Sequence, residues 1–165
     1  MGYTENLCTG GTPYAESQLG AGQAVSYAFD GNTGTYWQCA TSASPADTWV
    51  AYLFATAQAI ARVRTYGYAG DEARDFKDFK IQGSTDTTNG ADGTWVDLAT
   101  GQNMPATAAW TNHDFANSTS YKGIRLYGAK QYYNVSYPYV LHINEIEMMG
   151  FIADGGFMSC RSKFW

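Results

Sequence analysis

The stretch AFDGNTGTYW, residues 28–37, gathers the side chains of this chain that are best suited to chemistry. It places an acid, an amide, glycines and threonines within a few positions, beside aromatic residues. In so tight a segment the oxygens of Asp and Asn serve one of two purposes. They cap the backbone of their own turn, or they bind a hard cation such as Ca²⁺, which takes six or more oxygen ligands. The segment is therefore a turn, a metal site or both.

Catalytic signatures do not accompany this segment. The chain has no G-x-S-x-G, no H-E-x-x-H and no phosphate-cradling glycine loop, and its two histidines lie in different segments without metal-ligand spacing. Two acidic pairs have the residue types of glycosidase carboxylates, and they are Asp71 with Glu72 and Glu145 with Glu147. We interpret the first pair as part of a surface loop. We therefore predict that the chain is not an enzyme.

The elements that must position these residues are mostly strands. The composition favours many short strands joined by turns, because the chain contains 18 Gly, 13 Tyr, 8 Phe and 5 Trp and only 15% charged residues. A length of 165 residues is that of one domain. Few windows have the apolar spacing of a helix.

Strand-like patterns recur along the chain. Residues 48–55 have the pattern of a buried strand, and residues 59–68 alternate with a period near two. Residues 75–86 continue this pattern and are followed by N-G and D-G turn signals, after which residues 94–99 resume it. Further strands are expected over 121–127 and 139–150. Seven or eight such strands without intervening helices predict an all-β fold, an antiparallel β-sandwich with Greek-key or jelly-roll connections.

The charge distribution excludes some partners. A net charge of −5 with scattered Lys and Arg leaves no basic patch, so we expect no nucleic acid partner. No run of 18 apolar residues occurs, and the first residues do not have the pattern of a signal peptide, so we expect no membrane insertion. The aromatic content suits a sugar, whose apolar ring face stacks on Tyr or Trp.

The three cysteines lie far apart and signal neither a disulfide framework nor a zinc site. Reduced, partly buried thiols are the simpler interpretation. A bridge from Cys8 to Cys160 remains open if the protein meets an oxidising medium.

Five segments in this order resemble the discoidin or coagulation-factor type C superfamily: AFDGNTGTYW, TWVAYLF, DFKDFKIQGSTD with the TW that follows, YKGIRLY and INEIEMMG. The resemblance implies a galactose-binding-like jelly roll, similar also to carbohydrate-binding modules and to the N-terminal domain of galactose oxidase. It covers residues 14–150, which leaves 1–13 as an N-terminal lead-in and 151–165 as a C-terminal tail. It also implies that Trp37, Trp49 and Arg125 are structural.

The resemblance further implies a structural Ca²⁺ ion at the opening segment. Its ligands would be the carbonyls of Tyr27 and Asn144, the carboxylates of Asp30 and Glu145, and oxygens of Asn32 and Thr35. A carboxylate such as Glu145 among apolar neighbours is costly unless it is paired, which favours the metal over the plain turn. The segment is then both a turn and an ion site.

In relatives that bind sugars, the ligand lies on loops at one end of the sandwich. The matching loops here are 68–75 and 129–139, and their candidate sugar-binding residues are Tyr68, Asp71, Arg74, Tyr132, Tyr133 and Tyr137. An Arg beside carboxylates binds vicinal hydroxyls while a Tyr stacks on the ring. The alternative is that these residues form a solvated loop and rim packing.

Two functions follow as expectations. One is a glycan-binding module for cell adhesion, displayed on a phage virion or another extracellular surface without a signal peptide, and otherwise cytoplasmic. The other is a structural decoration or adaptor subunit of a capsid or tail that does not bind sugar. In both, the apolar tail 151–165 is expected to dock against neighbouring protein subunits.

Overall fold

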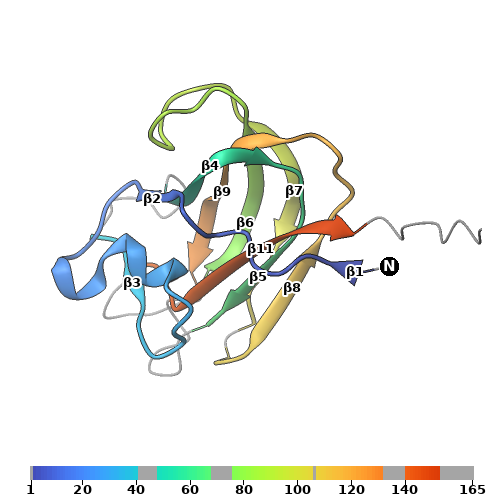
Figure 1. Ribbon diagram of the computed structural model, residues 1–165. Coiled ribbons are helices and arrows are strands. Elements are labelled where there is room, and N and C mark those ends of the chain that lie inside the picture. The colour runs from blue at the N-terminus through green and yellow to red at the C-terminus, as the bar shows by residue number, and fades with distance from the viewer. Residues whose placement is uncertain (1, 41–47, 68–75, 106, 132–139, 153–165) are drawn as a thin grey trace, which may run out of the picture.

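The computed structural model describes residues 2–40, 48–67, 76–105, 107–131 and 140–152 (Figure 1). These residues form two short 3-10 helices, η1 (Ala21–Gln23) and η2 (Val25–Phe29), and eleven strands. The strands are β1 (Gly2–Tyr3), β2 (Thr12–Ala15), β3 (Trp37–Gln38), β4 (Trp49–Gln58), β5 (Ile60–Tyr66), β6 (Phe76–Ser84), β7 (Val96–Gln102), β8 (Trp110–Asp114), β9 (Tyr121–Gln131), β10 (His142–Ile143) and β11 (Glu145–Ile152).

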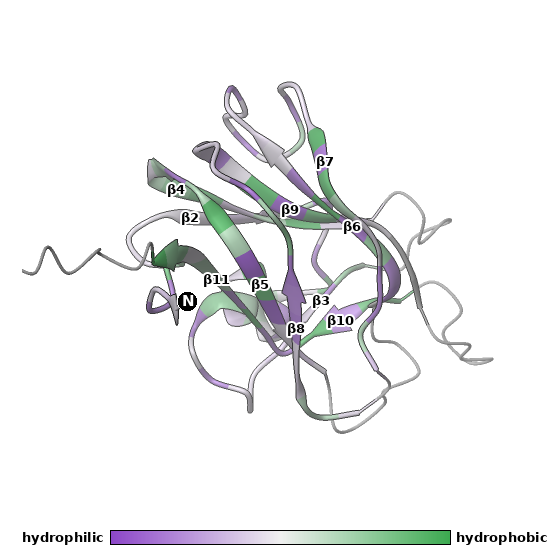
Figure 2. Ribbon diagram, turned by 90° about the vertical axis from the view of Figure 1, so that its right-hand side faces the viewer, coloured by the Kyte–Doolittle hydropathy of each residue, from purple (hydrophilic) through white to green (hydrophobic). Residues whose placement is uncertain are grey.

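Two larger sheets lie face to face, as Figures 1 and 2 show. A four-stranded sheet has the order β1-β11-β5-β8, and a five-stranded sheet has the order β2-β4-β9-β6-β7. A short ladder joins β10 to β3. Neighbouring strands pair antiparallel throughout. The predicted all-β antiparallel sandwich is confirmed.

The main core lies between the two sheets because the strands alternate apolar and polar side chains. In β5, Val63 is fully buried while Arg62 and Arg64 on either side remain partly exposed. The core is built from both sheets, with β4, β6 and β9 on one side and β5 and β11 on the other. Trp37, with 0% exposure, belongs to this core as predicted.

The outer face of β4 is also buried. Trp49, Ala51 and Leu53 form a second cluster, against which Tyr14 and Tyr127 pack. The loop that joins β6 to β7 covers this cluster, because a Cβ placed on Gly90 would lie 2.8 Å from the Trp49 ring. Trp49 is therefore structural, as expected, but it supports this loop on the outer face and does not fill the space between the sheets.

Arg125 from β9 joins the same loop to the sheet. Its guanidinium donates to Gln82 Oε1 at 2.8 Å and to the carbonyl of Gly90 at 3.0 Å. It also lies 4.0 Å from the ring centroid of Trp95 and 4.4 Å from that of Tyr127. These contacts give Arg125 the structural role that was expected of it.

Element boundaries differ from the expectations at several points. The predicted strand 139–150 is divided, since β10 pairs with β3 whereas β11 pairs with β5. Residues 129–131 of the predicted tyrosine-rich loop belong to β9. Strand β1 and the start of β2 fall within the predicted lead-in, and the first two residues of the predicted tail complete β11.

The two cysteines of the described region, Cys8 and Cys39, are buried, and burial raises the pKa of both thiols. Cys160 lies outside the described residues, so its bridge to Cys8 stays a prediction. Within the described part of the chain, the helices are too short and too polar to cross a membrane.

Candidate functional site

The predicted ion-binding segment forms a turn closed by its own side chains. Helix η2 ends at Phe29, and Gly31 then takes a φ of 76°, which glycine tolerates at little cost. Asp30 Oδ1 accepts the Asn32 amide at 2.8 Å, and Asn32 Oδ1 accepts the Gly34 amide at 2.9 Å. Thr35 Oγ1 donates to Asp30 Oδ2 at 2.8 Å. The capping that the sequence suggested is thus present.

A carboxylate from the far end of the chain completes the turn. Glu145, the first residue of β11, is 0% exposed. Its Oε2 accepts the amide of Gly31 at 2.8 Å and that of Asn32 at 3.1 Å. The turn is therefore fixed to the end of the four-stranded sheet by one buried acid.

Burial, and after it the negative charge of Asp30, raise the pKa of Glu145 to about 8, against the lowering effect of the backbone amides of Gly31, Ile146 and Asn32. Glu145 is buried whereas Asp30 is exposed, and a buried carboxylate beside a second negative charge favours a proton or a cation. A proton or a cation would therefore compensate the negative charge of Glu145 and Asp30 in the turn.

Unsatisfied oxygens mark where such a charge would lie. Glu145 Oε1 and Asn144 Oδ1 are buried without a hydrogen-bond partner among the described residues. Asn144 Nδ2 donates to the carbonyl of Thr33 at 2.7 Å, so this amide is oriented by the turn itself. All of these groups are oxygen donors, the type that Ca²⁺ prefers. The residues present therefore fit the predicted ion.

The structure brings five of the six predicted ligands into one bonded cluster, namely Asp30, Asn32, Thr35, Asn144 and Glu145. The sixth, Tyr27, lies in η2, which leads into the turn. Within the described ranges no cluster of three or more His, Cys, Asp or Glu side chains is suited to a metal. The predicted set contains two such side chains, because carbonyl, amide and hydroxyl oxygens supply the rest.

The predicted sugar-binding residues Tyr68, Asp71, Arg74, Tyr132, Tyr133 and Tyr137 lie outside the described residues. The strand ends on either side of them are described. Phe76, where β6 begins, pairs with Gln131, where β9 ends. Tyr66, where β5 ends, pairs with Glu145. The start of β6, which follows residues 68–75, therefore lies beside the end of β9, which precedes residues 132–139. The end of β5, which precedes residues 68–75, lies beside Glu145, the acid of the ion-binding turn.

An aromatic and arginine cluster, which the sequence interpretation missed, lies at the same strand ends. Trp110 opens β8 opposite Tyr66, with their ring centroids 5.4 Å apart, and it is 37% exposed. The guanidinium of Arg64 lies 4.1 Å from the Trp110 ring and is held by Glu147. The available signal was an isolated Trp after a polar, Ala-rich stretch. Its neighbours come from other strands, so sequence spacing does not reveal them.

The two histidines do not form an accessible catalytic site. His113 lies 3.1 Å from Thr65 Oγ1 and 3.1 Å from Gln102 Oε1, and burial lowers its pKa to about 4. Thr65 is 0% and His113 is 4% exposed, so a substrate does not reach this hydroxyl and imidazole pair. His142 is also buried, with Tyr36 against its ring.

The family assignment agrees with this architecture. The model of the F5/8 type C domain matches residues 14–143, and the chain belongs to this family. The resemblance on which the sequence interpretation rested is thereby confirmed. Among curated proteins, none matches the chain.

Solved structures with this fold include carbohydrate-binding modules. Chitosan-binding module 1 of a chitosanase/glucanase from Paenibacillus sp. IK-5 is 26% identical, with a TM-score of 0.71 over 89% of this chain and 100% of that chain. Chitosan-binding module 2 of that enzyme, solved with chitotriose, is 26% identical, with a TM-score of 0.69 over 87% and 98%. The family 32 module of NanJ from C. perfringens, solved with galactose, is 14% identical, with a TM-score of 0.71 over 89% and 98%, which shows the fold alone.

Proposed function

We propose that this chain is a non-catalytic carbohydrate-binding module whose sugar site lies at the strand ends beside the ion-binding turn. The observation that carries the proposal is the cluster of Trp110, Tyr66 and Arg64 at those ends. A partly exposed indole offers an apolar face for a sugar ring, and an arginine nearby donates hydrogen bonds to hydroxyl groups. Family membership and the chitosan-binding neighbours at 26% identity support this proposal.

The predicted loop residues extend this site. Tyr68, Asp71, Arg74, Tyr132, Tyr133 and Tyr137 belong to the connections that leave from these strand ends. A surface glycan would contact Trp110 from the sheet and the tyrosines and Arg74 from the loops. Charge-assisted bonds from Arg74 and Asp71 would then select the hydroxyl pattern.

We also propose a structural Ca²⁺ ion in the turn. Asp30, Asn32, Thr35 and Glu145 would hold it through side-chain or carbonyl oxygens, and Tyr27 and Asn144 would complete the ligands. The ion would compensate the charge of the buried Glu145 and of Asp30 beside it, and it would fix η2 and the turn against β11. Its role would be to stabilise the conformation of the sugar-binding end of the sandwich.

The direct test is a glycan-array screen of the purified protein, run with Ca²⁺ and again with a chelator. Saturable binding that is lost in both Trp110→Ala and Tyr133→Ala is the expected result. Val96→Ala, which truncates another exposed side chain on the other sheet, should leave binding unchanged. A folded protein that binds no glycan with Ca²⁺ present would overturn the proposed function.

A second function is supported by a different observation. Phe151 and Ile152 at the end of β11 are 46% and 48% exposed, and they are the first two residues of the apolar tail predicted to dock on neighbouring subunits. Exposed apolar side chains of this kind favour a protein contact. The module would then be a subunit of a larger particle, such as a phage virion. Incorporation of the module into such a particle that is lost in Phe151→Ser but kept in Trp110→Ala would support this role.

A further inference from the structure

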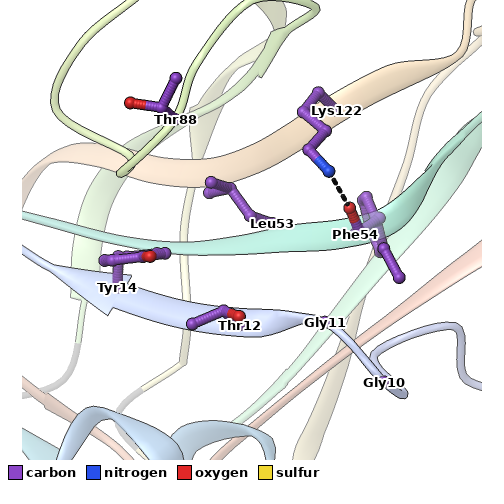
Figure 3. A pocket seen from close by; sticks show the side chains of 9 residues that line it. Gly10, Gly11, Thr12, Tyr14, Leu53, Phe54, Thr88 and Lys122 are labelled. Atoms are coloured by element: carbon purple, nitrogen blue, oxygen red, sulfur yellow. Dashed lines mark hydrogen bonds between the residues drawn. The ribbon is translucent and has the colours of Figure 1, made fainter.

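A hollow lies on the outer face of the five-stranded sheet, away from the ion-binding turn. Its volume is about 200 Å³, and its walls come from β2 and the two glycines before it, the middle of β4, the start of β9 and the loop that joins β6 to β7. Figure 3 shows Thr12 and Tyr14 on one side, Leu53 on the floor, and Thr88 and Lys122 on the other side. A volume below the ~300–1,000 Å³ of sites for drug-sized ligands suits a single sugar ring.

The hollow combines an apolar base with a single charged wall. Leu53, which is 6% exposed, forms the base, and Tyr14 packs beside it. Lys122 Nζ donates to the carbonyl of Phe54 at 2.7 Å, which is its one hydrogen bond among the described residues (Figure 3). An ammonium group has three N–H donors. Lys122 Nζ therefore presents a positive charge and two further donors that have no acceptor among the described residues.

The acid bonded to Thr88, a residue that lines the hollow, has its hydrogen bonds supplied by the covering loop. Asp92 accepts four hydrogen bonds, from the hydroxyl of Thr87, the amide and hydroxyl of Thr88 and the amide of Asn89. These donors lower the pKa of Asp92 to about 2. The Thr88 hydroxyl donates its proton to Asp92, so its oxygen is left as an acceptor at a residue that lines the hollow.

The opposite rim is fixed by close packing. The Gly11 amide donates to Tyr52 Oη at 2.8 Å, and a Cβ on Gly11 would lie 2.2 Å from the carbonyl of Leu53. The backbone directly before β2 is therefore in close contact with β4 at this point. The hollow has two firm sides, formed by β2 and by the covering loop, and is pre-formed for a ligand.

We propose that this hollow is a second ligand site that takes a carboxylate-bearing sugar ring, such as a uronic acid. The carboxylate binds Lys122 Nζ, the apolar ring face lies on Leu53 and Tyr14, and hydroxyl groups bond to Thr12 and Thr88. Lys122 forms no ion pair with an acid of the described residues, so its charge selects the carboxylate, and the apolar base selects the ring over a simple anion. The site extends the proposed sugar-binding function to a second face of the module.

Amide NMR titration with sodium glucuronate tests this site, with glucose and sodium acetate as matched probes at equal ionic strength. Glucuronate should shift the amides of Gly10, Gly11, Thr12, Thr88 and Lys122, with a Kd at least tenfold below those of the other two probes. Equal binding of glucose overturns the role of the charge. Equal binding of acetate overturns the role of the ring, and the absence of shifts at these residues overturns the site.

Lys122→Gln keeps a donor for the Phe54 carbonyl and removes the charge, so it should stay folded and raise the Kd for glucuronate at least tenfold. Lys122→Met is a second variant for the same readout. Lys77→Met, which neutralises an exposed lysine on β6, is the matched control and should not change the Kd. Trp110→Ala should leave this titration unchanged, so failure of the second site and failure of the proposed function give different results.

Discussion

Glu145 accepts a hydrogen bond from the Gly31 amide at 2.8 Å, across 114 positions of the sequence. This bond joins the first residue of β11 to the turn that follows η2. It also places the Glu145 carboxylate near that of Asp30, whose charge adds to the effect of burial on the Glu145 pKa. The turn therefore depends on how these two acids are compensated.

Asp30→Ala should lower the melting temperature and abolish the response to a chelator. The variant removes one proposed Ca²⁺ ligand together with the caps that Asp30 provides to Asn32 and Thr35. Loss of such a cap costs about 1 kcal/mol, and an ion bound at 100 times its Kd contributes about 2.7 kcal/mol. Thermal unfolding with Ca²⁺ and with EDTA measures both effects.

Glu5→Ala is the control for this experiment, because Glu5 is an exposed acid outside the turn. It should melt like the parent and keep the same response to the chelator. If Asp30→Ala also melts like the parent under both conditions, the ion site is wrong.

Arg125→Met should destabilise the protein by about 2–4 kcal/mol. The variant keeps much of the side-chain volume but removes two hydrogen bonds and the stacking on Trp95 and Tyr127. Bonds to a charged group contribute about 1.5–3 kcal/mol, and a cation–π contact contributes about 0.5–2 kcal/mol. Urea unfolding measures the loss. A change below 0.5 kcal/mol would mean that Arg125 does not hold the covering loop.

Gly90→Ala tests the same loop through the backbone. Gly90 has a φ of 82°, and an added Cβ would lie 2.8 Å from the Trp49 ring. Strain of this kind costs about 1–3 kcal/mol. Gly22→Ala is the matched control, since Gly22 has open space around its Cβ position and no positive φ. The two melting temperatures should differ by several degrees, and equal values would contradict the packing described for Trp49.

His113 should make the protein less stable in mild acid. Its pKa is lowered from 6.5 to about 4 in the folded state, chiefly by burial. The unfolded chain then binds the proton more readily, so stability is complete above pH 6.5 and falls as the pH drops toward about 4. The full contribution approaches about 3 kcal/mol.

Comparison with His113→Gln isolates this contribution, because the other titrating groups are the same in both proteins. Urea unfolding at pH 7.5 and at pH 4.5 should show a larger loss for the parent than for the variant. Equal losses in the two proteins would exclude His113 as the source of the acid sensitivity.

The fold was predictable because apolar side chains repeat at strand spacing. Val63 between Arg62 and Arg64 marks one buried face directly in the sequence. The division of residues 139–150 into β10 and β11 was not predictable, because all residues from Val140 to Ile146 are buried and the alternation disappears. Only the partner strands, β3 and β5, separate the two elements.

For the candidate site, the sequence by itself determined the local part. The residue types of 28–37 specify a capped turn with oxygen donors, since Asp30 and Asn32 bond to amides two positions away. The tertiary structure alone decided that Glu145 closes this turn, that Trp110, Tyr66 and Arg64 form one cluster, and that Lys122 faces a hollow beside β2. The physical reason is that strand pairing joins residues far apart in the chain, and such register depends on the packing of the whole sandwich.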